Sequence, residues 1–400
     1  MTCRERLVVD WLLLGTQEIM ALTVLLTLGR LPKALDLARA FATRGARVVV
    51  AEPHGWHLCR VSRAVARSVR VTAPVVDQAG YCRDLLRVII EERVDLVVPV
   101  SEESMHAAAL GERLPPGVRL ASVSQSRLIA LHDKLGFIRL AAERGLPVPD
   151  SYRLGTPEAA QLAAEVDTVC KPRFGCGGRD VDWLLSGAPL PAVDAAQERL
   201  VQRHLPGETV CAFAIARAGC VLGSVQYRPR ILSGTVAVAF ERLDPLPAVT
   251  EWISTFVAAE EHDGFIAFDF IVGADGVARA IECNPRATSG VHFFTAQALA
   301  TMLLDGEAVA QPFREQRLLQ QFFPTLTEWN SAFRDRARWH AVRRVLFTAH
   351  DVTWQWSDPL PLLTMPLTAA GIIWQAARRS VPFGEVATLD IDYHPSEASE

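Results

Sequence analysis

Apolar, β-rich runs alternate with amphipathic segments through the first quarter of the chain. Residues 22–28, 47–51 and 95–100 have the composition of buried strands, and residues 34–44 and 81–92 have helical spacing of their apolar side chains. Strands separated by helices in this way pair in parallel. The pattern therefore predicts an α/β fold whose N-terminal part is a doubly wound parallel sheet.

The segment after the first predicted strand argues against one common use of such a sheet. It reads Gly29-Arg30-Leu31-Pro32-Lys33 and lacks the Gly-x-Gly-x-x-Gly fingerprint, so a Rossmann dehydrogenase is disfavoured. Ligand-binding groups gather at the carboxyl ends of parallel strands, which puts several charged side chains near one crevice. Each of them taken singly is equally well explained as a solvated loop charge. These side chains are Arg30, Lys33, Glu52, Glu102 and Glu103.

The basic residues are distributed in an unusual way. Lys and Arg total 41 against 45 Asp and Glu, a net charge of −4, so we expect no nucleic-acid partner. Only three of the 41 are lysines, namely Lys33, Lys134 and Lys171. An ammonium and a guanidinium are not interchangeable in a tight site, so these lysines are candidates for specific roles. Chance is the alternative explanation.

The termini and the cysteines predict a cytoplasmic protein without a membrane partner. The eight cysteines form no Cys-x-x-Cys pair and no zinc-type spacing, and we interpret them as reduced thiols. Residues 1–21 show no signal-peptide pattern and are expected to be an N-terminal extension, with Met1 or Met20 as the start. Prolines interrupt the apolar residues 360–377, which favours a buried element over a membrane span.

A glycine-rich loop follows a lysine in the middle of the chain. A helix is expected from Asp133-Lys134 to about Arg144, and a strand at residues 168–172. The strand runs into Arg173-Phe174-Gly175-Cys176-Gly177-Gly178, whose backbone N–H groups can approach an anion closely. Such a loop alone is more often a simple turn, but its position directly after Lys171 strengthens the interpretation.

A β-hairpin is predicted further along the chain. Residues 265–272 and 277–283 have strand composition, and Asp275-Gly276 between them is the strongest two-residue hairpin signal. With these two residues at the centre of the turn, the numbers of paired residues sum to a constant, and Asp269 faces Glu282 across the ladder.

That register brings two carboxylates together. The Cβ atoms of Asp269 and Glu282 would lie about 5 Å apart, with Asn284 on the same face. Like charges that face each other destabilise a sheet, and a divalent cation such as magnesium would explain them. The alternative is a pair that is exposed to solvent or neutralised by Arg279 or Arg286.

Taken together, these segments resemble the ATP-grasp superfamily over roughly residues 22–305, and within it the branch that is like carbamoyl-phosphate synthase and biotin carboxylase. No one segment is decisive, but their order and spacing are specific, and two of the three lysines fall on the family's nucleotide-binding lysine positions. The segments are Asp133-Lys134, Lys171-Pro172 with Gly175-Cys176-Gly177-Gly178, Gln202-Arg203-His204-Leu205 with Pro206-Gly207-Glu208, Phe268-Asp269-Phe270, and Ile281-Glu282-Cys283-Asn284-Pro285-Arg286.

The resemblance implies a domain organisation. Residues 22–125 would be a Rossmann-like pre-ATP-grasp domain, and residues 126–310 an ATP-grasp domain of α+β character with a hinged lid at about 150–203. Residues 311–400 lie outside the confident resemblance and are expected to form a C-terminal subdomain, with a last strand at 386–393.

The resemblance also implies ATP and Mg²⁺, or Mn²⁺, as cofactors. Lys134 and Lys171 would contact the ATP phosphates, and Asp269, Glu282 and Asn284 would hold the metal. Lys171 and Arg286 would stabilise the transferred phosphoryl group. The other implied contacts are Gly175, Gly177 and Gly178 over the phosphates, Gln202, Arg203, His204 and Leu205 at the adenine, and Glu208 on the ribose. An acidic residue is frequent where Gln202 stands, so its amide oxygen would have to accept from the adenine amino group.

The implied chemistry is that of a carboxylate–amine ligase. ATP would phosphorylate a carboxylate, and an amine would attack the acyl phosphate, in small-molecule biosynthesis. Two alternatives remain open: a non-catalytic nucleotide-binding or regulatory protein, and a kinase-like enzyme that phosphorylates a hydroxyl or enol. The substrates are left unidentified, and a homodimer is the oligomer considered. Candidate substrate contacts are Arg228, Arg230, Thr288, Ser289 and Glu102.

Overall fold

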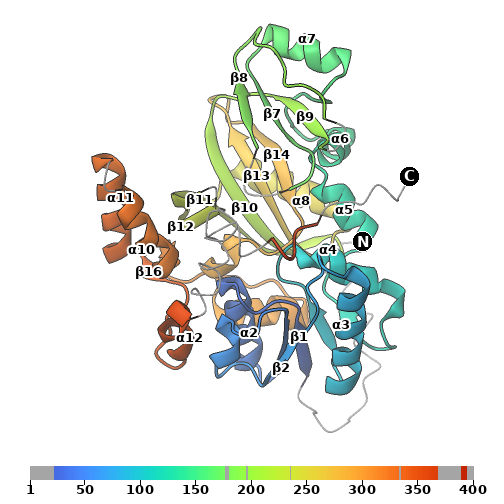
Figure 1. The fold of residues 1–400 in the computed structure, drawn as a ribbon, viewed down its shortest axis with the longest axis vertical. Coiled ribbons are helices and arrows are strands. Elements are labelled where there is room, and N and C mark those ends of the chain that lie inside the picture. The colour runs from blue at the N-terminus through green and yellow to red at the C-terminus, as the bar shows by residue number, and fades with distance from the viewer. Residues whose placement is uncertain are drawn as a thin grey trace.

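The computed structural model describes residues 22–175, 180–194, 197–234, 236–332, 335–367 and 389–393. Figure 1 shows a parallel sheet flanked by helices, a larger sheet above it, and a small sheet beside α7 at the far end. The expected mixed α/β class and the N-terminal parallel sheet are confirmed.

The N-terminal sheet has five parallel strands in the order β3-β2-β1-β4-β5. Helices cover both of its faces, because Val24 and Leu26 of β1 pack in the same cluster as α2 and Leu25 packs in the same cluster as α3. The strand order reverses between β1 and β4, because β2 and β3 lie on one side of β1 whereas β4 and β5 lie on the other. The crevice at the carboxyl ends of β1 and β4 is therefore the position where such sheets bind ligands. The elements are β1 (Thr23–Leu26), α2 (Pro32–Thr43), β2 (Arg47–Glu52), η1 (Leu58–Val61), β3 (Arg67–Arg70), α3 (Gln78–Glu92), β4 (Leu96–Val98), α4 (Glu103–Ala107), η2 (Ala108–Arg113) and β5 (Arg119–Leu120).

A seven-stranded sheet has the order β14-β13-β10-β11-β12-β15-β16, and its pairs are antiparallel except β15 with β16. One face packs on α8, where Trp252 and Phe256 contact Phe268 and Phe270. The other face turns toward the N-terminal sheet. The elements are α5 (Gln125–His132), α6 (Lys134–Glu143), β10 (Glu208–Arg217), β11 (Cys220–Ser233), β12 (Val236–Arg242), α8 (Pro247–Ala259), β13 (Gly264–Val272), β14 (Ala278–Asn284), η3 (Ser289–Phe293), α9 (Ala296–Ala300), η4 (Thr301–Asp305), β15 (Leu318–Gln320) and β16 (His350–Asp351).

A four-stranded antiparallel sheet with the order β6-β9-β7-β8 lies in the segment expected to be the lid. Helix α7 begins where Thr156 accepts from the backbone N–H of Ala159, and it buries Ala159 and Leu162 against the sheet. The elements are β6 (Ser151–Arg153), α7 (Pro157–Glu165), β7 (Thr168–Pro172), β8 (Asp182–Leu184) and β9 (Arg199–Arg203).

The C-terminal region adds helices beside the seven-stranded sheet. Helices α10 (Phe322–Ser331) and α11 (Arg336–Thr348) form a pair at one side of the molecule in Figure 1, and α12 (Leu360–Leu363) packs on η1 of the N-terminal part. The strand expected at 386–393 is wrong for the residues that the structure describes, since 389–391 form a turn and 392–393 have no regular structure.

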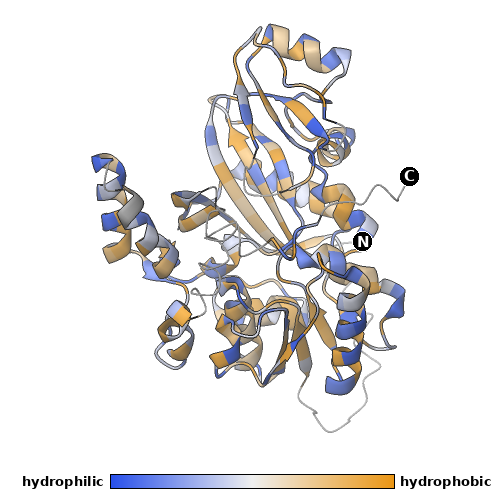
Figure 2. Ribbon diagram, in the orientation of Figure 1, coloured by the Kyte–Doolittle hydropathy of each residue, from blue (hydrophilic) through white to orange (hydrophobic). Residues whose placement is uncertain are grey.

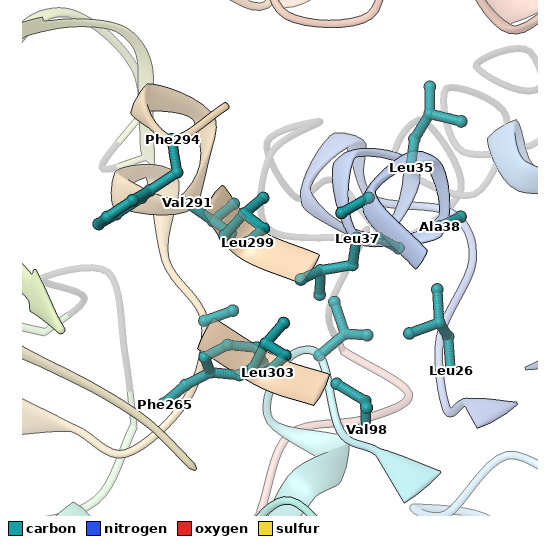
Figure 3. Close-up of a cluster of buried hydrophobic side chains, with 14 of the residues drawn as sticks. Leu26, Leu35, Leu37, Ala38, Val98, Phe265, Val291, Phe294, Leu299 and Leu303 are labelled. Carbon is teal, nitrogen blue, oxygen red and sulfur yellow. The ribbon is translucent and has the colours of Figure 1, made fainter. Parts of the chain in front are cut away.

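One buried cluster joins the two large sheets. Figure 3 shows Leu26 and Val98 of the parallel sheet, Leu37 of α2, Leu299 of α9 and Phe265 of β13 as members of this cluster. These side chains are at most 5% exposed, so the two halves share a continuous apolar core. Figure 2 shows the same contrast over the whole fold, with hydrophobic strands inside and hydrophilic residues on outer helices such as α3.

Two expectations about the whole chain can be compared with the fold. Among the described residues, no helix is both long enough and apolar enough to cross a membrane. Five cysteines are free thiols, but Cys220 is disulfide-bonded, so the expectation of eight reduced thiols is wrong at that position. Composition and spacing gave no indication of that bond.

Candidate active site

The hairpin of β13 and β14 brings Asp269 opposite Glu282. The turn that joins the strands lies one residue earlier than expected, with the N–H of Gly276 donating to the carbonyl of Gly273 at 3.0 Å. A bulge between Asp269 and Phe270 in the ladder then restores the expected pairing. Asp269 and Glu282 therefore project from the same face of the sheet.

The bulge also provides a hydrogen-bond acceptor. Phe270 pairs with Ala280 and Asp269 pairs with Glu282, so Ile281 is the extra residue. Its carbonyl accepts from the Nζ atom of Lys171 at 3.1 Å. Strand β14 is at the edge of the sheet, where a bulge is easily accommodated.

The carboxylate pair carries an electrostatic cost. Burial, followed by the charge of Glu282, raises the pKa of Asp269 from its ordinary 3.8 to about 6, whereas a hydrogen bond from the Cys211 thiol lowers it. Cys211 pairs with Asp269 from β10 and lies on the same face. The geometry thus holds two acidic groups closer together than their charges favour.

Asn284 and Arg286 connect the Asp269–Glu282 pair to the N-terminal parallel sheet. An NH2 group of Arg286 donates to the amide oxygen of Asn284 at 3.2 Å and lies 3.1 Å from a carboxylate oxygen of Glu102. Glu102 is buried and begins α4 after the carboxyl end of β4. The crevice of the N-terminal sheet and the hairpin therefore meet at the Glu102–Arg286 ion pair.

The donor atoms fit a hard divalent cation. Among the described residues no three His, Cys, Asp or Glu side chains cluster as a metal site. The oxygen donors on this face of the hairpin are the carboxylates of Asp269 and Glu282 and the amide of Asn284. Oxygen ligands of this number suit magnesium, which usually keeps waters and phosphate oxygens in its shell. Asp269, Glu282 and Asn284 would hold it, and the raised pKa of Asp269 is the imbalance that such a cation relieves.

Lys171 lies at the end of β7, facing the hairpin. Its Nζ atom donates to the amide oxygen of Gln202 at 3.0 Å as well as to Ile281. Burial lowers the pKa of Lys171 from 10.5 to about 8, and the charge of Glu282 acts in the opposite direction. The side-chain NH2 group of Gln202 donates to Ser151, so its amide oxygen already points toward the lysine.

Lys134 reaches the same group from α6. Its Nζ atom donates to the carbonyl of Gly175 at 2.5 Å and lies 3.9 Å from a carboxylate oxygen of Glu282. Asp133 holds this end of the helix, because it accepts from the N–H of Leu135 and from the side chain of Arg173. Gly175 has φ 105, a left-handed conformation that favours glycine. Gly177 and Gly178 lie outside the described residues.

The remaining expected nucleotide contacts follow β9. Arg203 is ion-paired with Asp150, and the ring of His204 lies 5.1 Å from that of Trp183. Leu205 is half-buried and Glu208 is exposed at the start of β10. These side chains line the connection from the small sheet to the seven-stranded sheet, away from the Asp269–Glu282 hairpin pair.

The expected substrate contacts are separated by the sheet. Tyr227 pairs with Cys211 and so shares the face of Asp269, and its hydroxyl donates to Thr288 at 3.1 Å. Arg228 follows Tyr227 and therefore projects from the opposite face, where it and Arg230 are ion-paired with Glu241. The structure thus brings Thr288, but not the two arginines, to the face that carries the carboxylates. Ser289 follows at the start of η3.

Two residues of the site were missed in the sequence. His132 is buried at the end of α5, and burial lowers its pKa to about 4, with Glu102, Lys134 and Arg286 among the charges around it. Cys211 was not distinguished from the other thiols. A single histidine before Asp133 and a cysteine in an apolar strand carry no signal until the helices and strands are placed.

Comparison with known proteins identifies the fold of this chain through solved structures. No protein-family model matches the sequence, and no curated protein matches it. N5-carboxyaminoimidazole synthetase from Staphylococcus aureus is 12% identical with a TM-score of 0.59, over 79% of this chain and 87% of that one. The L-amino acid ligase from Bacillus licheniformis is 15% identical with a TM-score of 0.54, over 71% and 74%.

A third similar structure was solved with a nucleotide. The biotin carboxylase domain of 2-oxoglutarate carboxylase from Hydrogenobacter thermophilus, in complex with MgADP, ADP and bicarbonate, is 15% identical with a TM-score of 0.56, over 73% of this chain and 71% of that one. The chain thus has the fold of these solved structures, which is the ATP-grasp fold that the resemblance drawn from the motifs implied.

Proposed function

We propose that this protein is an ATP-dependent carboxylate–amine ligase. It phosphorylates a carboxylate to an acyl phosphate, joins the acyl group to an amine, and releases ADP and phosphate. The observation that carries the proposal is the convergence of Lys134, Lys171 and Arg286, from three separate segments of the chain, on the Asp269–Glu282 pair. The fold is shared with ligases that include an L-amino acid ligase, which supports the class.

Each side chain has a role that its surroundings support. Lys134 and Lys171 bind the phosphates, and Arg286 and Lys171 offset the charge that develops on the transferred phosphoryl group. Asp269, Glu282 and Asn284 would hold Mg²⁺, or Mn²⁺, whose charge would neutralise part of that on the phosphates. No nucleophilic side chain is required, because the substrate carboxylate itself attacks the phosphoryl group.

The nucleotide base would bind on one side of these phosphate-binding and metal-binding residues, and the substrates would bind on the other side. Gly175, Gly177 and Gly178 cover the phosphates, and an acyl phosphate is protected from water when the lid closes. Thr288, Ser289 and Glu102 are the proposed substrate contacts, since Arg228 and Arg230 lie with Glu241 on the other face. Gln202, Arg203, His204 and Leu205 form the proposed adenine site, with Glu208 on the ribose.

The broader organisation is proposed in the same terms. We propose a pre-ATP-grasp domain at 22–125, an ATP-grasp domain at 126–310 with its lid at 150–203, and a C-terminal subdomain at 311–400. We further propose a cytoplasmic enzyme of small-molecule biosynthesis, active as a homodimer.

The experiment measures ADP and phosphate release by the purified protein with Mg-ATP and pools of carboxylic acids and amino acids. We expect release only when a carboxylate and an amine are both present, and an amide product by mass spectrometry. Glu282→Gln should abolish release, whereas Asp275→Asn, in the same hairpin but exposed, should not. A phosphorylated hydroxyl or enol as product would instead identify a kinase, and tight ATP binding without turnover in any pool would favour a regulatory protein.

A further inference from the structure

Residues 389–393 lie across the carboxyl edge of the N-terminal sheet. The carbonyl of Asp390 accepts from the N–H of Val75, in the segment after β3, and the carbonyl of Asp392 lies 3.3 Å from Nε2 of His106 in α4. Ile391 between them is fully buried in the core cluster that joins the two sheets. The chain's own C-terminal segment thus covers the edge where a doubly wound sheet binds ligands.

Arg30 contacts this segment, and Glu52 binds Arg30 from the side of the N-terminal sheet. Arg30 lies in the loop between β1 and α2, and its side chain is 2% exposed. Glu52, the last residue of β2, is fully buried and accepts from the N–H groups of Gly29 and Arg30 at 2.9 and 3.0 Å and from the Arg30 guanidinium at 2.8 Å. Glu52 thus binds both the backbone and the guanidinium of Arg30, in addition to the contact that the guanidinium makes with the C-terminal segment.

The outer edge of that guanidinium binds a carboxylate. NH1 and NH2 of Arg30 donate to the two oxygens of Asp390 at 2.6 and 2.9 Å, a two-pronged arrangement typical of carboxylate recognition. Nε2 of His54 lies 3.3 Å from the same carboxylate. His54 and Asp390 are the accessible members, with 25% and 22% of their side chains exposed.

The position of this pair relative to the candidate active site is informative. Lys33, three residues after Arg30, donates to Ser101 and to the carbonyl of Ala287, next to Arg286. Glu102, which follows Ser101, is the residue that meets Arg286. The contacts of Lys33, Ser101 and Glu102 thus connect the loop that carries Arg30 to the proposed phosphoryl-transfer site.

We propose that Arg30 and His54 form a carboxylate-binding subsite for a substrate, which the protein's own Asp390 occupies in this structure. The inference rests on the proposed function for the nature of the substrate, a small carboxylic or amino acid. Asp390 acts as an internal competitor that a substrate carboxylate displaces. Ile391 keeps the segment attached when this exchange occurs, because its side chain is fully buried in the core cluster.

The test is direct binding of acetate, measured calorimetrically with chloride at matched ionic strength as the blank. A tethered carboxylate competes at an effective concentration in the millimolar range. We therefore expect Asp390→Ala to bind acetate more tightly than the unsubstituted protein, by a factor of one plus the ratio of this effective concentration to the Kd for a carboxylate. Arg30→Lys added to Asp390→Ala should remove the gain, because an ammonium cannot bind both oxygens in this way.

Asp358→Ala is the matched control. Asp358 also lies in the C-terminal part and also pairs with a buried arginine of the N-terminal part, Arg39, at 3.0 Å, but outside the crevice. We expect it to lose stability without gaining acetate affinity. Equal acetate affinity in the unsubstituted protein and Asp390→Ala would overturn the subsite, as would tighter binding of inorganic phosphate than of acetate.

The isosteric variant Asp390→Asn keeps the test decisive if the alanine variant unfolds. Loss of folding in both would identify a purely structural ion pair and overturn the proposal. ADP binding is measured in the same samples. Acetate gain without ADP binding would reject the proposed function and leave the subsite, whereas ADP binding without acetate gain would reject the subsite alone.

Discussion

Replacing Asp269 with asparagine should stabilise the metal-free protein and remove its response to magnesium. Folding raises the pKa of Asp269 from 3.8 to about 6, first through burial and then through Glu282. The folded state therefore binds the proton more tightly than the unfolded chain, and stability from this group falls as pH rises from 3.8 to 6. The difference between 3.8 and about 6 corresponds to an upper limit of about 3 kcal/mol at pH 7, which asparagine recovers.

The assay is urea unfolding at pH 7 with and without Mg²⁺ and ADP. We expect a higher midpoint for Asp269→Asn without ligands, and a midpoint that magnesium no longer raises. Asp275→Asn is the matched control, because Arg279 lowers the pKa of Asp275 at an exposed position of the same hairpin. It should be slightly destabilised and keep the magnesium response. A lower midpoint for Asp269→Asn than for the unsubstituted protein would refute the electrostatic reasoning.

Three further changes test the fold and the site. Leu299→Ala removes a fully buried side chain from the cluster between the sheets, and urea unfolding should show a loss of about 2–5 kcal/mol. Asp133→Ala removes the N-cap of α6 and a partner of Arg173, so we expect a loss of about 1 kcal/mol in the same assay, together with weaker ADP binding by calorimetry. Folding lowers the pKa of Lys171 from 10.5 to about 8, so the unfolded chain binds the extra proton between these values and stability should rise with pH there. In Lys171→Met this part of the pH dependence should disappear, and an unchanged pH profile would exclude a buried ammonium.

The parallel sheet could be predicted from the sequence because a strand buried on both faces must be apolar throughout. Val24, Leu25 and Leu26 are fully buried, and the helices that follow β1 and β3 have the spacing needed to cover the sheet. The strand ends were less accurate, since β4 is Leu96–Val98 and not 95–100. Residues beyond it are already in the loop that carries Glu102.

The long-range contacts of the site could not be predicted from the sequence. The ion pair between Arg30 and Asp390 joins residues 360 positions apart, and no local pattern relates them. Arg228 and Arg230 stand close to Tyr227 in the sequence, yet Arg228 lies on the opposite face from Tyr227. Which face a residue occupies depends on pairing register, and register is set by partner strands.

The hairpin shows how closely the site depends on that register. The turn alone, one residue earlier than expected, would have set Asp269 opposite Ile281 and turned Glu282 to the other face of the sheet. The bulge at Ile281 cancels this shift. Asp269 and Glu282 therefore face each other as expected, although the pairs between the turn and the bulge are shifted by one residue. The same extra residue leaves a carbonyl available to Lys171. One irregularity in an edge strand therefore both pairs the acidic groups and positions the lysine, which explains why the strand departs from a regular ladder at this position and not elsewhere along the hairpin.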